Sequence, residues 1–194
     1  MIAIIDYDAG NIRSVTNALE RIGASYTLTS DPEVIRKAEK VILPGVGSAA
    51  EAMASLRSKG LVDVIRGLRK PVLGICVGMQ IMCGHSEEGD VACMGIFDCD
   101  VRKFSPSPEA KVPHMGWNAI CNLDGKLFKG ISSGSYVYFV HSYYAPLCPD
   151  TVATCRHGDL LFSAALKYEN FYGTQFHPEK SGDIGENILK NFIG

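Results

Sequence analysis

Three side chains of this sequence have the types and setting needed for covalent catalysis: Cys76, His177 and Glu179. Cys76 lies in Gly-Ile-Cys-Val-Gly, which fits the pattern of a nucleophile elbow. The flanking Gly74 and Gly78 leave room for the sharp turn from strand to helix that an elbow requires. That turn lifts the sulfur above the sheet edge, near a helix N-terminus that favours the thiolate. On this segment alone, a buried structural thiol explains Cys76 equally well.

His177 and Glu179 lie in a second segment, Gly-Thr-Gln-Phe-His-Pro-Glu-Lys over residues 173–180. A nucleophilic cysteine needs a base to take its proton, and the base needs a third group to orient it. A histidine followed two residues later by a carboxylate can supply both. The two segments together favour a Cys-His-Glu triad over a structural thiol and an isolated histidine. The chemistry of such a triad is acyl transfer.

A third segment, Pro-Gly-Val-Gly at residues 44–47, could stabilise the oxyanion that acyl transfer creates. We expect one N–H donor from Val77, the residue after the nucleophile. We expect another from Gly45, Val46 or Gly47, because glycine lets a peptide approach or rotate. Taken alone, residues 44–47 fit a plain strand-to-helix turn just as well.

The elements around these segments indicate the fold class. In the first half, apolar strand-like runs alternate with helical patterns, which predicts an α/β protein with a mainly parallel sheet flanked by helices on both faces. Ligands bind beyond the carboxyl ends of such strands, where Cys76 and residues 44–47 both fall. In the second half, short runs at 95–104, 112–120, 135–144, 151–156 and 162–168 predict a smaller antiparallel region, and a helix follows from Ile184. The length of 194 residues suits a single domain, 1–194.

Composition excludes several functional classes. The formal net charge of −2 gives no electrostatic case for nucleic-acid binding. No apolar run approaches the roughly 20 residues of a membrane span, and no basic leader precedes the first strand. The 7 cysteines are an odd number at irregular spacing, so we expect no disulfide framework. None forms a Cys-x-x-Cys pair, so we expect no metal site. Mostly reduced thiols imply a cytoplasmic location. Gly-Val-Gly-Ser at 45–48 lacks the lysine of a phosphate-binding loop, and we expect no cofactor.

The elbow Gly-Ile-Cys-Val-Gly-Met-Gln, the His-Pro-Glu segment and Pro-Gly-Val-Gly together resemble the class I glutamine amidotransferases, over essentially the whole chain. The resemblance implies that the triad hydrolyses the side-chain amide of glutamine, and that the ammonia passes to a partner synthase. It implies the same oxyanion donors. It also implies that Gln80 and the segment His141, Ser142 and Tyr143 hold the amino and carboxylate groups of glutamine.

Four further stretches resemble one branch of that family, the glutaminase subunits of imidazole glycerol phosphate synthase in histidine biosynthesis. These stretches begin at Ile5, Pro113, Tyr138 and His177 and have the sequences IDYDAGNIRSV, PHMGWN, YFVHSYY and HPEKS. This resemblance implies a heterodimer with a (β/α)8-barrel cyclase. It implies that the interface residues are Asn11, Trp117 and Lys180.

Three other functions remain open at this stage. The chain could be a glutaminase for another synthase, which ammonia-transfer assays with candidate synthases would discriminate. It could be a cysteine peptidase, which thioester formation with glutamine and no peptide cleavage would exclude. It could also be a non-catalytic interaction subunit that has kept the fold, although the presence of Cys76, His177 and Glu179 argues against this.

Overall fold

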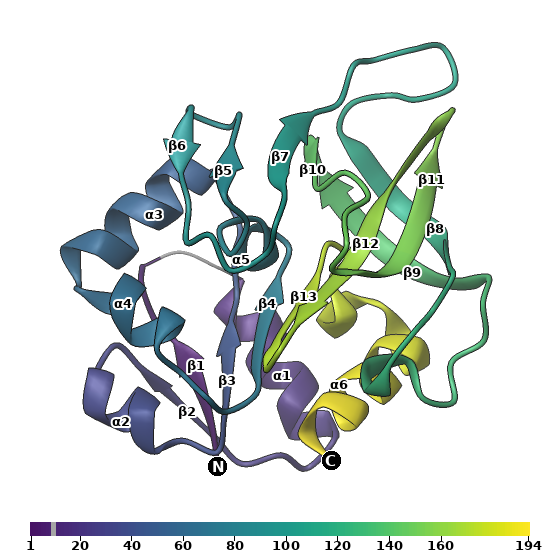
Figure 1. Cartoon of the computed structure of the whole chain (residues 1–194). Coiled ribbons are helices and arrows are strands. Elements are labelled where there is room, and N and C mark those ends of the chain that lie inside the picture. The colour runs from purple at the N-terminus through teal and green to yellow at the C-terminus, as the bar shows by residue number, and fades with distance from the viewer. Residues whose placement is uncertain (9–10) are drawn as a thin grey trace.

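The computed structural model describes residues 1–8 and 11–194; residues 9 and 10, which belong to the stretch beginning at Ile5, lie outside the described part. A nine-stranded sheet runs through the molecule (Figure 1). Its strands, in spatial order, are β2 (Tyr26–Thr29), β1 (Ile2–Ile5), β3 (Lys40–Leu43), β4 (Val72–Ile75), β13 (Phe171–Thr174), β12 (Leu160–Tyr168), β11 (Thr151–His157), β8 (His114–Cys121) and β9 (Ser135–His141).

The sheet changes character at β13. The strands from β2 to β13 pair in parallel, and those from β12 to β9 pair antiparallel. Strands β1 and β4 are buried along their whole length, as expected for parallel strands covered on both faces. The predicted fold class is therefore confirmed, with the antiparallel strands continuing the parallel sheet.

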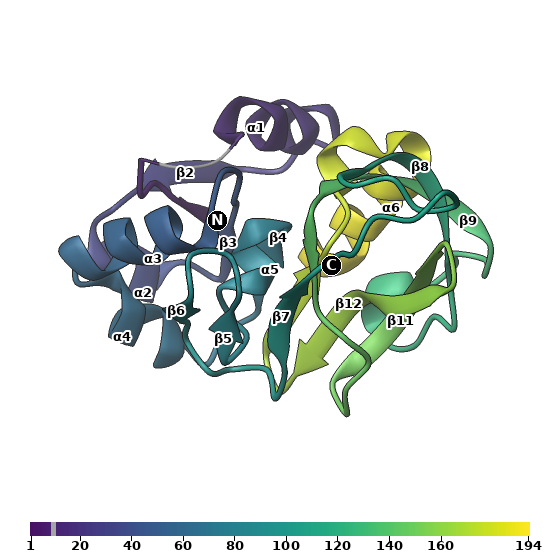
Figure 2. The same ribbon diagram turned by 90° about the horizontal axis from the view of Figure 1, so that it is seen from above.

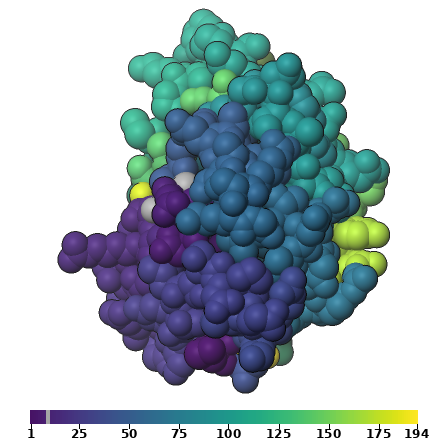
Figure 3. Space-filling view, turned by 90° about the vertical axis from the view of Figure 1, so that its left-hand side faces the viewer, coloured from purple at the N-terminus to yellow at the C-terminus, as the bar shows by residue number. Residues whose placement is uncertain are grey.

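Helices cover both faces of the sheet. Helices α1 (Ile12–Arg21) and α6 (Gly182–Ile193) lie on one face, and α2 (Pro32–Lys37), α3 (Ala49–Ser58) and α4 (Leu61–Arg66) lie on the other (Figure 2). The side of the molecule formed by the N-terminal half is seen in purple to teal in Figure 3.

Local sequence sets the helix starts, since the Asn11, Asp31 and Ser48 side chains each accept a backbone N–H at an N-cap. No helix in the described ranges is long and apolar enough to cross a membrane.

A second, four-stranded sheet lies above the carboxyl ends of the central strands (Figure 1). Its strands are β10 (Tyr143–Tyr144), β7 (Asp100–Lys103), β5 (His85–Ser86) and β6 (Val91–Ala92). The run predicted at 95–104 is thus a strand only in its second half. The run predicted at 135–144 divides at Ser142 into β9 and β10, each in a different sheet.

Two elements near the nucleophile differ from the sequence prediction. The helix after Cys76, α5 (Val77–Gln80), is a single turn, and Ile81 and Met82 lie beyond it. Strand β13 was not predicted at all. It pairs in parallel with β4, so that Thr174 lies opposite Ile75. This pairing brings the segment around His177 to the same sheet edge as Cys76.

Candidate active site

Cys76 occupies a strained turn between β4 and α5. Its backbone has φ 54° and ψ −110°, an unusual conformation for a residue with a side chain. Such strain costs about 1–3 kcal/mol and persists where the surrounding structure enforces it. A Cβ on Gly78 would lie 2.0 Å from the carbonyl oxygen of Leu43, and one on Gly74 would lie 2.6 Å from that of Gly78. The two glycines therefore allow the close backbone contacts of an elbow, as predicted.

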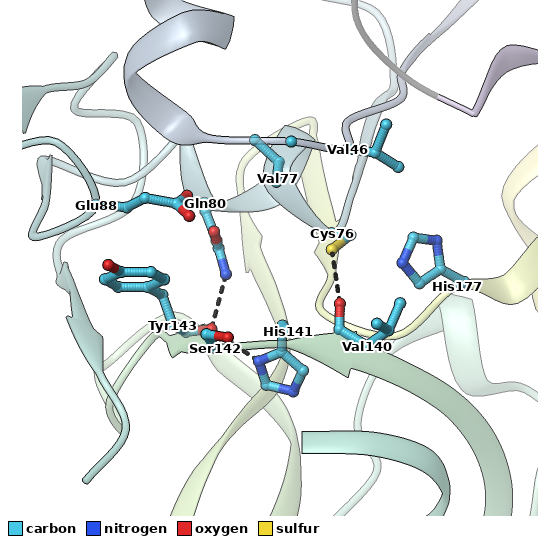
Figure 4. A pocket seen from close by; sticks show the side chains of 11 residues that line it. Val46, Cys76, Val77, Gln80, Glu88, Val140, His141, Ser142, Tyr143 and His177 are labelled. Carbon is cyan, nitrogen blue, oxygen red and sulfur yellow. Dashed lines mark hydrogen bonds between the residues drawn. The ribbon is translucent and has the colours of Figure 1, made fainter. Parts of the chain in front are cut away.

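His177 and Glu179 form a buried pair beside this elbow. The Nδ1 atom of His177 lies 2.8 Å from Oε1 of Glu179, and each side chain is 1% exposed. The carboxylate can only accept, so the proton of the neutral imidazole is on Nδ1 and Nε2 is free to take another. Nε2 has no hydrogen-bond partner among the described residues. Figure 4 shows the His177 ring beside Cys76 at the pocket.

The electrostatics of this pair favour a protonated histidine. Burial by itself would lower the pKa of His177. The nearby Cys76 sulfur and the Glu179 carboxylate outweigh burial and raise that pKa above its ordinary value. An imidazolium beside the sulfur stabilises a thiolate, which is the nucleophilic form of cysteine.

Cys76 and His177 line a pocket of about 190 Å³. Sites for drug-sized ligands typically hold roughly 300–1,000 Å³, so this pocket suits a ligand the size of an amino acid. Its lining includes most of the residues that the sequence predicted (Figure 4): Val46, Gly47, Cys76, Val77, Gln80, His141, Ser142, Tyr143 and His177.

Two of the predicted substrate-binding side chains bond to the protein itself. The Nε2 atom of Gln80 donates to the Tyr143 carbonyl at 2.8 Å and to Oε1 of Gln175 at 2.9 Å. The ring of His141 donates from Nδ1 to the same carbonyl at 2.7 Å. Both side chains therefore fix the position of Tyr143, and Gln80 keeps its Oε1 as an acceptor.

Glu88 also lines the pocket, although no sequence pattern predicts a role for it. Its Oε2 accepts the backbone N–H of Ala49 at 2.8 Å, which fixes the carboxylate at the start of α3. Burial raises the pKa of Glu88, with the Ala49 hydrogen bond opposing the shift. The sequence carries no signal for this role, because a glutamate in Ser-Glu-Glu-Gly-Asp looks like any solvated turn residue.

Three of the four residues predicted to supply oxyanion donors line the pocket. Val46, Gly47 and Val77 line the pocket, whereas Gly45 packs against the backbone of Gly78. The backbone N–H groups of these four residues donate to no other described residue, and those of Val46, Gly47 and Val77 belong to residues that line the pocket. Gly47 has φ +87°, a conformation that favours glycine.

The residues assigned to a partner interface lie outside the pocket. Asn11 caps α1 by accepting the N–H of Ser14, and Trp117 on β8 is 55% exposed. The ammonium of Lys180 lies 5.9 Å from the ring of Tyr138, the residue that pairs with Trp117 across β8 and β9. Helix α1 packs on the 3-10 helix at 178–180, and this helix packs on β9. The three residues therefore come from neighbouring elements.

Comparison with known proteins places the chain in a family. The family model described as Glutamine amidotransferase class-I matches residues 3–194. Imidazole glycerol phosphate synthase subunit HisH from Bacteroides fragilis is 56% identical over 193 residues, covering 99% of this chain and 98% of that protein. The HisH protein of Xanthomonas campestris is 47% identical, covering 99% of this chain and 96% of that protein.

The fold also resembles that of solved structures. The crystal structure of a glutamine amidotransferase from Thermotoga maritima matches with a TM-score of 0.63 and 18% identity, covering 99% of this chain and 81% of that chain. At this level of identity, the match shows a shared fold alone. The family match and the HisH relatives go further: the chain belongs to the class I glutamine amidotransferase family and, within it, to the group of HisH proteins of imidazole glycerol phosphate synthase.

Proposed function

We propose that this chain hydrolyses glutamine through a glutamyl thioester on Cys76 and supplies the ammonia to a (β/α)8-barrel cyclase, which makes imidazole glycerol phosphate and aminoimidazole carboxamide ribonucleotide. The observation that carries this proposal is the strained elbow at Cys76, which opens onto a pocket of amino-acid size beside the buried His177–Glu179 pair. The name of the HisH relatives supports the choice of pathway.

In the first half of the reaction, the Cys76 thiolate attacks the side-chain amide carbon of glutamine. The new S–C bond pushes the carbonyl electrons onto oxygen. The N–H of Val77 and one from residues 45–47 stabilise that oxyanion, and each such donor typically contributes about 10²–10³-fold in rate. When the intermediate collapses, the C–N bond breaks and ammonia leaves with a proton from Nε2 of His177.

In the second half, water attacks the thioester and His177 takes its proton. The C–S bond then breaks, which releases glutamate and returns the thiolate. Glu179 accepts from Nδ1 throughout, so that Nε2 stays directed to the reacting atoms and the imidazolium is stabilised.

Charge and hydrogen-bonding capacity suggest how glutamine binds. Glu88 and the free Oε1 of Gln80 suit its ammonium group, because both are acceptors at the pocket wall. Ser142 and Tyr143 also line the pocket, and their hydroxyl groups can donate to its carboxylate. Glutamate lacks the leaving amide and carries an extra charge near Cys76, which favours its release.

The partner interface belongs to the exposed face of β8 and β9. Met115 is 66% exposed, Trp117 55% and Tyr136 60%, an apolar group of the kind that protein interfaces bury. Lys180 directly follows Glu179, so a partner that contacts Lys180 adjoins the triad. The 7 cysteines are all free thiols, which suits work in the cytoplasm.

The test uses the complex of this chain with its cyclase. Product formation is measured with glutamine and, separately, with ammonium salt as the nitrogen source. We expect Cys76→Ala to abolish the glutamine-dependent reaction and to leave the ammonia-dependent reaction intact. Loss of both reactions in a correctly assembled complex would contradict the proposal. Glutamine hydrolysis without transfer to the cyclase would indicate a glutaminase for a different synthase.

A further inference from the structure

We propose that Gln175 is a second hydrogen-bond partner of the catalytic sulfur, and that its side-chain amide stabilises the Cys76 thiolate. The proposal rests on the proposed function and adds a residue to the same site. Gln175 follows β13, and its side chain is fully buried. Its Nε2 donates to Sγ of Cys76 at 3.7 Å, within the range for a bond to sulfur.

A chain of hydrogen bonds fixes which end of the Gln175 amide faces the sulfur. The Tyr143 carbonyl can only accept, so the neighbouring amide nitrogen of Gln80, at 2.8 Å, must be the donor. The same nitrogen lies 2.9 Å from the Gln175 side chain, which must therefore present its oxygen there. The nitrogen of Gln175 is left to face Cys76. A flipped amide would oppose two donors at Gln80 and direct an oxygen at the sulfur.

The surroundings of Cys76 show why such a donor matters. The sulfur also faces the backbone carbonyl of Val140, with Sγ and O 3.9 Å apart, so a protonated thiol can donate to that carbonyl. This carbonyl favours the protonated thiol and repels the thiolate. Once His177 holds the proton, the Gln175 N–H is a side-chain amide dipole that stabilises the negative charge.

The stabilisation that the Gln175 N–H provides depends on the negative charge on the Cys76 sulfur, which changes during the reaction. When Sγ bonds to the amide carbon, its electron pair enters the new bond and the hydrogen bond from Gln175 weakens. When water opens the thioester, that pair returns to sulfur, and the Gln175 N–H stabilises the leaving thiolate. Gln80 lines the glutamine pocket and holds Gln175 in place, so Gln175 connects the substrate wall to the nucleophile.

The test compares Gln175→Met, which keeps the side-chain length without a donor, with Gln175→Glu, which replaces the donor by an acceptor. Thr174→Val is the matched control, because Thr174 is the preceding residue, is equally buried, and has a hydroxyl without a partner in the described chain. Alkylation of Cys76 by iodoacetamide is followed across pH in the complex, with mass spectrometry of the Cys76 peptide separating it from the other cysteines. This reaction reports thiolate directly and needs no glutamine turnover, so it tests Gln175 independently of the glutaminase activity.

We expect Gln175→Met to lower the alkylation rate at neutral pH by roughly tenfold, the lower range for a hydrogen bond to a charged group. Alkaline pH should restore the rate, and kcat/KM for glutamine should recover in parallel. Gln175→Glu should raise the pH at which alkylation reaches half its maximal rate by more than Gln175→Met does. Thr174→Val should leave this pH midpoint unchanged. A wild-type midpoint in both Gln175 variants, whether or not they melt at lower temperature, would overturn the proposal and leave Gln175 a packing residue.

Discussion

The hydroxyl of Tyr7 donates a hydrogen bond of 2.6 Å to the carbonyl of Pro44, the first residue of the loop that we propose supplies an oxyanion donor. Tyr7 is fully buried, two residues beyond the end of β1. Burial raises its pKa, and the charge at Cys76 adds to the shift, so the hydroxyl stays protonated and remains a donor. The bond thus ties residues 44–47 to the core of the sheet.

Tyr7→Phe removes this tie and keeps the ring. A released loop would hold its N–H groups less well in the oxyanion site, which acts in the transition state. We therefore expect kcat for glutamine hydrolysis in the complex to fall by about tenfold, with KM near the wild-type value. Tyr26→Phe is the matched control, since it removes a bond of the same length, 2.6 Å to Glu20, from the surface. Equal kinetics in both variants would show that the loop needs no support from Tyr7.

Glu88→Gln tests how glutamine is held. Because Glu88 would contact the ammonium group in both ground and transition states, we expect KM to rise by roughly tenfold and kcat to stay similar. The control is Glu33→Gln, in an exposed ion pair on α2. Steady-state kinetics of the complex provide the measurement. An unchanged KM for Glu88→Gln would remove Glu88 from the substrate site.

His177→Asn and Glu179→Gln should damage glutamine hydrolysis unequally. In the proposed mechanism His177 moves the proton, whereas Glu179 orients the imidazole through the 2.8 Å bond to Nδ1. We expect the loss of kcat to be smaller for Glu179→Gln, with ammonia-dependent synthesis unaffected in both. If Glu179→Gln lost as much as Cys76→Ala, the carboxylate would have a more direct part in the chemistry.

A buried histidine pair next to the pocket predicts sensitivity to acid. Nδ1 of His114 lies 2.9 Å from Nε2 of His141, and His141 donates onward to the Tyr143 carbonyl, so both rings are neutral. Burial lowers the pKa of His114 from 6.5 to about 4 and that of His141 to about 3. Below pH 6.5, the unfolded chain therefore binds protons at these histidines that the folded chain does not bind. The stability that the neutral pair contributes is complete above pH 6.5 and is lost as the pH falls toward these values.

The variant His114→Gln removes one of these titrating groups. We expect it to be less stable than wild type at neutral pH, because bonds to His141 and Asn118 are lost. The difference in the free energy of unfolding should narrow as pH falls from 6.5 to about 4, measured by urea unfolding. A difference that is independent of pH would mean that the folded chain protonates His114 normally.

The sequence predicted the elements whose patterns are local. The glycines at 74 and 78 identify the elbow, and the alternation of apolar runs with helical patterns identifies the parallel half of the sheet and its helices. Of the predicted residues that line the pocket, Val46, Gly47, Cys76 and His177 follow the parallel strands β3, β4 and β13, whose carboxyl ends lie at one edge of the sheet.

Other features depend on tertiary pairing that one sequence does not reveal. Strand β13 has only 4 residues and includes Gly173, so its pattern is weak, and its place is set by pairing with β4 and β12. The break of the 135–144 run at Ser142 depends on β7, which pairs with Tyr143 and Tyr144. Glu88 reaches the pocket because its carboxylate bonds to Ala49, 39 residues earlier in the chain.

The covalent state of Cys76 tests the central claim most directly. The complex is mixed with glutamine, quenched in acid during turnover, and digested for peptide mass spectrometry. We predict a mass increase of one glutamyl group on the Cys76 peptide, absent from Cys76→Ala and enriched in variants that slow the attack of water. An active complex that carries the glutamyl group on another residue, or on none under every quench condition, would contradict the thioester mechanism.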